Sequence, residues 1–277
     1  MPTSYVLKPD NLSYKGWTIH AWRYEPKRPV GTLIYLPGFE THGEMYEEHL
    51  DVFWRHRILV LELYLGSHPI KSVHDGLRLF MTYYRHKSKE VDLEDHILGG
   101  YSVGGLIAAH LAADTAGDHL APQWLLLESP AIPGLGIGSL EYALRFAGMA
   151  RKLRNGAEGE AGQSFARERG WGFVGSIGKN LGRSHRLLTS INESRIPNGS
   201  ISVPTRAILC ADDEFFPVKR SERWIKEICR SGLTTRIARI AGSHARILHT
   251  PEEANSIIRA DLREEWMRRK KGEPVRI

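Results

Sequence analysis

Short apolar runs alternate with helix-like patterns along most of the chain. Apolar runs of about four to eight residues between turn residues predict buried strands, and apolar positions three and four apart predict amphipathic helices. The predicted strands are 32–36, 58–63, 96–101, 124–127, 205–210 and 234–240, and the predicted helices are 44–54, 72–84, 103–113, 218–230 and 251–267. This alternation predicts an α/β fold with a doubly wound, mostly parallel sheet and helices on both faces. Segments 5–8 and 17–24 have no helix between them, so we expect an antiparallel edge there.

Residues 131–200 depart from this alternation. They contain no convincing strand and hold 13 of the 27 glycines, which predicts a loop-rich segment. We expect one amphipathic helix within it, over 139–153, whose apolar positions lie near one face: Leu140, Ala143, Leu144, Ala147 and Ala150. A long insertion of this kind is typical of a functional lid. We therefore interpret 131–200 as an inserted cap or lid, and 1–130 with 201–277 as the core.

The composition is that of an ordinary globular protein. Hydrophobic residues make up 42% of the chain and charged residues 25%, which excludes a disordered or collagen-like chain. The two cysteines, Cys210 and Cys229, are too few for a disulfide-built scaffold or a Cys-rich zinc site. We see no signal peptide and no apolar run near the ~20 residues that span a bilayer, so we expect a soluble, cytoplasmic protein.

A candidate nucleophile lies where the third predicted strand meets a predicted helix. The sequence there is Gly100-Tyr101-Ser102-Val103-Gly104, which matches the G-x-S-x-G nucleophile elbow. In such an elbow the serine sits on a turn too sharp for relaxed backbone angles, and the glycines keep neighbouring backbone from clashing. The five-residue pattern alone also fits a glycine-rich structural turn. The strand–turn–helix context favours Ser102 as a nucleophile.

A serine nucleophile needs a histidine base and an acid that orients the histidine. In the context of this elbow they follow in the order serine, acid, histidine. Asp213 follows the fifth predicted strand and His244 follows the sixth. Because catalytic groups gather at the carboxyl ends of parallel strands, these two residues are the candidate acid and base. The alternatives are Asp212 and Glu128 for the acid and His249 for the base.

Two backbone N–H groups should stabilise the oxyanion that forms during acyl transfer. We expect one from Val103, directly after the nucleophile, and one from Phe39, in the loop after the first core strand. For substrate binding we single out Tyr101 in the elbow and Trp171 and Phe173 in the cap. The two cap residues would either line an acyl pocket or attach the cap to the core.

The chain resembles the α/β-hydrolase superfamily, and more narrowly its lysophospholipase and monoacylglycerol lipase branch, the serine aminopeptidase-like group. The matching segments are 37–46, 66–68, 100–105, 127–131, 211–213 and 242–244. Pro37-Gly38 stands where that branch usually has His-Gly. The resemblance implies Ser102 as nucleophile, Asp213 as orienting acid, His244 as base and residues 131–200 as a cap over the pocket.

These observations predict a serine hydrolase that cleaves a small-molecule carboxylic ester through an acyl-enzyme, with no metal or cofactor. A lipid-like acyl ester such as a lysophospholipid or monoacylglycerol suits the resemblance. A thioesterase or lactonase would use the same triad. The runner-up is a non-catalytic protein that binds a ligand in the same pocket, because fold does not fix function.

The positive charge is concentrated in the predicted cap. The whole chain has a net charge of +6, and residues 131–200 contain ten basic and five acidic residues. A basic cap beside the candidate serine predicts attraction of an anionic substrate or peripheral contact with an anionic lipid surface. The alternative is a merely soluble lid. We expect no nucleic-acid partner, because no recognition motif accompanies the charge.

Overall fold

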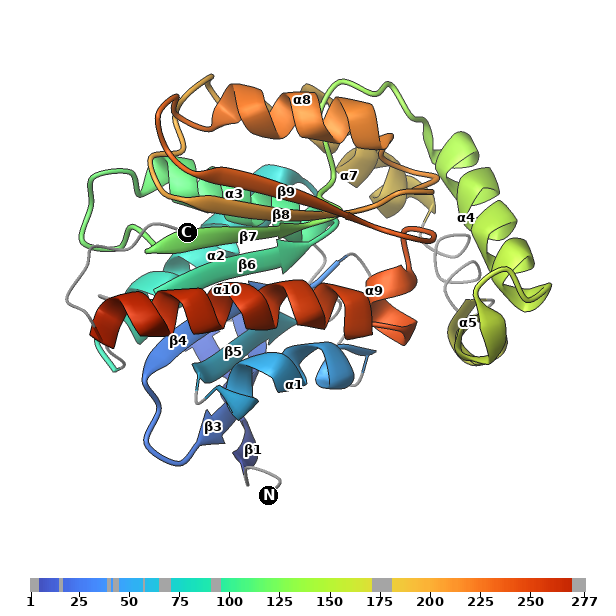
Figure 1. Cartoon of the computed structure of the whole chain (residues 1–277). Coiled ribbons are helices and arrows are strands. Elements are labelled where there is room, and N and C mark those ends of the chain that lie inside the picture. The colour runs from blue at the N-terminus through green and yellow to red at the C-terminus, as the bar shows by residue number, and fades with distance from the viewer. Residues whose placement is uncertain are drawn as a thin grey trace.

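A mixed, mostly parallel sheet forms the centre of the molecule (Figure 1). The computed structural model describes residues 5–14, 17–38, 41, 45–56, 58–64, 71–90, 96–170 and 181–270. The strands are β1 (Tyr5–Pro9), β2 (Leu12–Tyr14), β3 (Trp17–Pro26), β4 (Gly31–Leu36), β5 (Ile58–Tyr64), β6 (His96–Tyr101), β7 (Trp124–Glu128), β8 (Thr205–Cys210) and β9 (Thr235–Ile240). They follow the order β1-β3-β5-β4-β6-β7-β8-β9, and β2 pairs with β3.

The pairing directions confirm the predicted sheet. β5, β4, β6, β7, β8 and β9 are parallel to their neighbours in this order. β3 runs antiparallel to β1, β2 and β5, which confirms the expected antiparallel edge. The sequence reasoning missed β2, because three residues are too few to show an alternating pattern.

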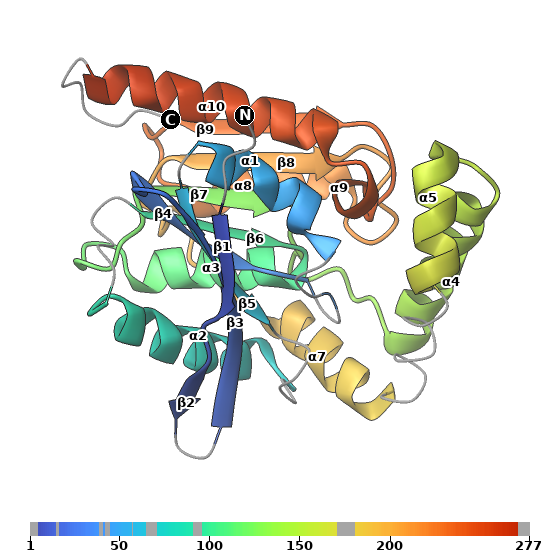
Figure 2. The same ribbon diagram turned by 90° about the horizontal axis from the view of Figure 1, so that it is seen from below.

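Helices cover both faces of the sheet (Figure 2). The helices α2 (Val73–Lys87), α3 (Val103–Asp114) and α8 (Val218–Ile228) pack on one face. The helices α1 (Glu47–Arg55) and α10 (Glu252–Lys270) pack on the other, and α9 (Arg246–His249) precedes α10. Side chains of each central strand alternate between the two cores: Ile34 and Leu36 face α3, whereas Leu33 and Tyr35 face α1. This period of two is the pleat of a sheet buried on both sides.

Where it is described, the region 131–200 is mostly helical. The helix expected over 139–153 is confirmed, whereas the expectation that the rest is loop-rich was wrong. It contains α4 (Ser139–Arg154), α5 (Gly159–Phe165), a π-helical turn (Ala166–Gly170) and α7 (Leu181–Glu193). Gly156 (φ +87°) and Gly159 (φ +71°) lie at helix ends, where a positive φ favours glycine. In Figures 1 and 2, α4 and α5 lie beyond the ends of the parallel strands, and α7 lies near α2. The division into a cap of 131–200 and a core stays a prediction.

None of the helices in the described ranges is long and apolar enough to cross a membrane.

Candidate active site

The turn between β6 and α3 holds Ser102 in a strained conformation. Ser102 has φ 54° and ψ −121°, which side-chain-bearing residues rarely adopt. Two glycines make the turn sterically feasible. A Cβ at Gly104 would lie 2.0 Å from the carbonyl oxygen of Leu36 in β4, and one at Gly100 would lie 2.6 Å from Gly104. The elbow thus needs glycine at both positions so that β4, β6 and α3 can approach.

Backbone hydrogen bonds to the end of β7 hold the strained turn. The N–H of Ser102 donates to the carbonyl of Glu128 (2.9 Å), and the N–H of Ala131 donates to the carbonyl of Ser102 (2.8 Å). The surrounding sheet therefore stabilises a conformation that the local chain would not adopt by itself.

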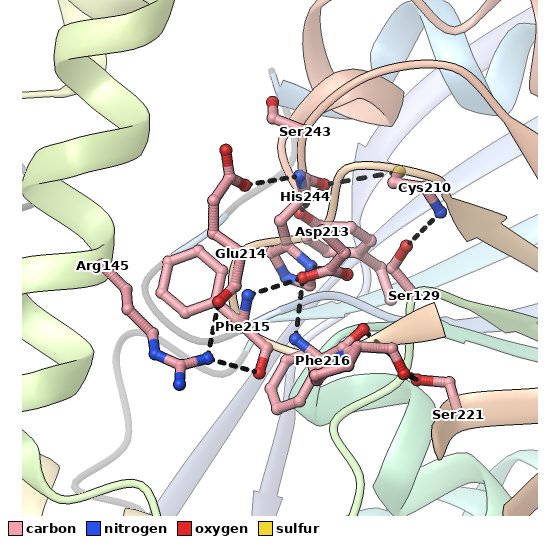
Figure 3. A network of polar contacts seen from close by, with 12 residues as sticks. Ser129, Arg145, Cys210, Asp213, Glu214, Phe215, Phe216, Ser221, Ser243 and His244 are labelled. Atoms are coloured by element: carbon pink, nitrogen blue, oxygen red, sulfur yellow. Dashed lines mark hydrogen bonds and ion pairs between the residues drawn. The ribbon is translucent and has the colours of Figure 1, made fainter. Parts of the chain in front are cut away.

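Asp213 and His244 meet at the ends of neighbouring strands β8 and β9. Asp213 Oδ2 lies 2.7 Å from His244 Nδ1, and the two side chains are only 2% and 8% exposed. The other carboxylate oxygen, Oδ1, accepts from the N–H groups of Phe215 (2.8 Å) and Phe216 (2.9 Å), as Figure 3 shows. These bonds hold the Asp213 carboxylate in one orientation. An acceptor at Nδ1 keeps the proton on that nitrogen, which leaves Nε2 as the basic atom of the ring.

Aromatic rings enclose the His244 imidazole. The ring centroids of Tyr101, Phe215 and Phe216 lie 4.9, 5.1 and 5.4 Å from it. The Tyr101 hydroxyl donates to the backbone carbonyl of His244 (2.7 Å), and burial raises the pKa of Tyr101 well above its ordinary value. Tyr101 thus joins the elbow directly to the segment that carries the histidine.

Ser102 and His244 line the same cavity, which has a volume of about 40 Å³. Apart from these two and Thr41, its walls are mostly apolar or aromatic: Gly38, Met45, Tyr101, Tyr142, Phe146, Met149, Phe165, Phe215, Ala245 and Leu248. Such a lining suits an apolar ligand that carries a reacting polar group.

Three of the wall residues come from α4 and correct part of the predicted helix face, of which Ala150 is buried as expected. Tyr142, Phe146 and Met149 line the cavity, whereas Leu140 and Leu144 are 75% and 63% exposed. The sequence does contain a signal for this face, because Tyr142, Phe146 and Met149 are spaced by four and three residues, as on one side of a helix. The alanine-rich face obscured it.

The expected oxyanion site is described in part. Val103 is the first residue of α3, so its N–H has no partner within the helix. The turn after β4 lies beside it: Gly38 donates its N–H to the Tyr46 hydroxyl (2.9 Å), and a Cβ at Gly38 would lie 2.9 Å from the Tyr101 ring. Phe39, Trp171 and Phe173 lie outside the described residues.

The alternative acids and base have other surroundings. The Glu128 carboxylate points to the face of the sheet that α1 covers, opposite to α3. There Tyr35 donates to it (2.6 Å), and His49 Nε2 lies 2.9 Å away. His249 Nε2 lies 3.0 Å from Glu158 of the predicted cap, and Asp212 is exposed. Among these candidates the structure brings Asp213 to His244. Within the described ranges, no group of three or more His, Cys, Asp or Glu side chains could hold a metal ion.

Several solved structures share this architecture over almost the whole chain. An α/β-hydrolase fold protein from Chitinophaga pinensis aligns with a TM-score of 0.67 and 12% identity, covering 92% of this chain and 97% of that one. The chain has the α/β-hydrolase fold. A monoacylglycerol lipase from Paleococcus ferrophilus (TM-score 0.60, 16% identity) covers 88% of this chain and 98% of its own. The thioesterase domain of the curacin biosynthetic pathway (TM-score 0.64, 15% identity) covers 91% and 99%.

Sequence comparisons are less informative than the fold. No family model matches the chain. A curated relative, Aurora kinase B from Mus musculus, is 34% identical over 76 residues, which are 24% of this chain. The chain spans about a fifth (22%) of that protein's length. So short a match does not place the chain in a family, and the solved structures show its fold alone.

Proposed function

We propose that this chain is a serine hydrolase that cleaves carboxylic esters, with Ser102 as nucleophile, His244 as base and Asp213 as orienting acid. One observation carries the proposal. His244, whose Nδ1 lies 2.7 Å from Asp213 Oδ2, lines a cavity that Ser102 also lines from a strained strand–helix turn. A structural glycine turn would not require a histidine–carboxylate pair beside it.

The geometry supports a two-step mechanism. His244 Nε2 accepts the proton of Ser102 Oγ as that oxygen attacks the ester carbonyl carbon, and the Val103 N–H stabilises the oxyanion. His244 then returns the proton to the leaving alcohol, and the C–O bond breaks to give an acyl-enzyme and the free alcohol. A water molecule, deprotonated by His244, then attacks the acyl carbon. The bond between that carbon and Ser102 Oγ breaks, His244 returns the proton to Oγ, and the carboxylic acid is released. Asp213 stabilises the imidazolium in both steps.

The cavity supports an apolar acyl group rather than a polar one. Its volume of about 40 Å³ lies far below the about 300–1,000 Å³ of ordinary ligand pockets, and α4 supplies much of the wall. A long acyl chain, such as that of a lysophospholipid or monoacylglycerol, would therefore enter only if the wall residues, three of which come from α4, moved apart. Thioesters and lactones suit the same catalytic groups and are the alternatives.

Covalent labelling tests the proposal. A fluorophosphonate probe should label the wild type, and Ser102→Ala should abolish labelling without unfolding the chain. An unlabelled, folded wild type would contradict the hydrolase and favour a non-catalytic binding protein. A chain-length series of nitrophenyl esters, run beside lysophospholipid and monoacylglycerol, tests the substrate class. Equal rates at all chain lengths would contradict an apolar acyl site.

An anionic partner for the cap stays a prediction. Of the basic side chains there, Lys152 pairs with Glu214 (3.4 Å) and Arg145 with Glu141 (2.5 Å), whereas Arg151 is exposed. If exposed cap charges attract an anionic ester, salt should slow its hydrolysis more than that of a neutral ester. Equal responses would contradict the prediction.

A further inference from the structure

A carboxylate of the predicted cap contacts the segment that carries His244. Glu158, at the start of α5, accepts the backbone N–H of Ser243 at 2.5 Å through Oε1. Its Oε2 lies 3.0 Å from His249 Nε2 and 3.7 Å from Arg246 Nη1. Ser243 directly precedes His244, so one side chain from α5 holds the backbone beside the proposed base and reaches α9 behind it.

Gly242, directly before Ser243, leaves room for the Glu158 carboxylate. Gly242 has φ +106°, and a Cβ there would lie 3.1 Å from both Cδ and Oε1 of Glu158 and 3.0 Å from Cδ of Arg246. The glycine therefore serves the turn and the approach of the carboxylate.

Glu158 is ionised at neutral pH. Burial by itself would raise the pKa of this carboxyl, but hydrogen bonds from His249 and Ser243 outweigh burial and lower the pKa to about 2. The side chain is only 8% exposed, so solvent screens the contact weakly. A buried, charged acceptor aimed at a backbone N–H restrains that backbone more strongly than a neutral one.

A second contact from α4 holds the loop of Asp213. Arg145 Nη1 donates to the backbone carbonyl of Glu214 (2.7 Å), and Glu214 Oε2 in turn accepts the N–H of His244 (3.3 Å) (Figure 3). Charged side chains of α4 and α5 thus contact the two loops that carry the proposed acid and base.

We propose that Glu158 is a positioning residue for His244. Through Glu158, the position of α5 determines how well the base aligns with Ser102. This inference rests on the proposed hydrolase function. Loss of the carboxylate would release the Ser243 N–H and let the His244 segment move. A misplacement of about 1 Å can cost on the order of 100-fold in rate, so the chemical step should suffer while substrate binding is retained.

The test uses the full chain with Glu158→Ala, Glu158→Gln and the control Glu160→Ala. Glu160 is exposed on the same short helix. Labelling by the fluorophosphonate and hydrolysis of nitrophenyl acetate are measured, and thermal unfolding shows that each variant is folded. We expect Glu158→Ala to lower kcat and the labelling rate by about 10- to 100-fold, with KM within about 2-fold of wild type. Glu158→Gln should recover part of the loss, because its amide oxygen still accepts the Ser243 N–H. Glu160→Ala should match wild type.

Two outcomes would overturn the inference while the proposed function stands. One is a labelled wild type with unchanged kcat and labelling rate in both Glu158 variants. The other is a rise in KM with unchanged kcat, which would place Glu158 in substrate binding rather than in positioning. If Glu158→Ala does not fold, the kcat of Glu158→Gln decides, and a wild-type value overturns the inference. An unlabelled wild type would refute the proposed function and this inference together.

Discussion

Two of the buried histidine–carboxylate pairs have different surroundings: His244 of one pair lines the cavity beside Ser102, whereas the other pair lies in the core beneath α1. Asp213 and His244 are 2.7 Å apart at the ends of β8 and β9. Glu128 and His49 are 2.9 Å apart between β7 and α1. The distances are almost the same, and the side chains of the second pair are 0% exposed.

The surroundings separate the two pairs. His244 shares a cavity with Ser102, and Asp213 also accepts two backbone N–H groups. The carboxylate of Glu128 is held instead by Tyr35, deep in the core beneath α1. A histidine–carboxylate pair is therefore a catalytic candidate only where the free ring nitrogen can reach a nucleophile and a substrate.

The pair of Glu128 and His49 still contributes to the site, through the backbone of Glu128. The carbonyl of Glu128 accepts the N–H of Ser102, while its side chain fixes His49 of α1 on the other face. Burying such a pair costs desolvation, so we infer that its role is to orient α1 on β7 rather than to add stability. Removing one partner alone should then be costly.

Exchange of each histidine should have the largest and most different effects. His244→Gln should lower kcat/KM by roughly 10⁶-fold with the fold retained, since the proposed base is lost. His49→Leu should keep the rate per folded molecule within about 3-fold but lower the free energy of unfolding by about 3–5 kcal/mol, because leucine cannot donate to the buried Glu128 carboxylate. Ester hydrolysis and urea unfolding of both variants test this. If both folded variants lost activity equally, the two histidine–carboxylate pairs would have the same role in catalysis.

Exchange of each acid should give smaller effects of the same kind. In Asp213→Asn, Oδ1 can keep the N–H groups of Phe215 and Phe216, which turns an amide NH₂ towards His244. The ring would then hold its proton on the wrong nitrogen, and kcat should fall by roughly 10⁴-fold. Glu128→Gln, the matched control, should change kcat by less than about 3-fold and stability by about 1–3 kcal/mol. If Asp213→Asn kept its activity and the double variant Asp213→Asn/Glu128→Gln lost it, the acid role would belong to Glu128 instead.

The central fold and the proposed triad could be predicted because local patterns encode them. Apolar runs such as the one in β6 predict buried strands, and the glycines around Ser102 predict a turn where no Cβ fits. Asp213 and His244 followed from one topological rule, that parallel strands end at the same edge of the sheet.

Within 131–200 the sequence pattern predicts α4 but neither α5 nor α7, because frequent glycine is typical of loops. In the structure several of these glycines mark helix ends, for example Gly156 and Gly159. The contact between Glu158 and Ser243 joins residues 85 positions apart and has no sequence period. Sequence patterns report which side of an element is apolar, and the partner of one charged side chain depends on tertiary packing.

A third buried carboxylate, that of Glu62, lies on the same face of the sheet as Glu128, and among the described residues a tyrosine rather than a histidine donates to it. Tyr24 donates to Glu62 (3.1 Å), and burial raises the pKa of Glu62 to about 8. Between pH 4.5 and about 8 the native state therefore holds a proton that the unfolded state has released. The free energy of unfolding should fall across this range by a few kcal/mol and level off above it, and Glu62→Gln should remove that decline. Urea unfolding at pH 5, 7 and 9 measures it, with the exposed Glu48→Gln as control. A decline that persists in Glu62→Gln would show that Glu62 ionises freely in the native protein.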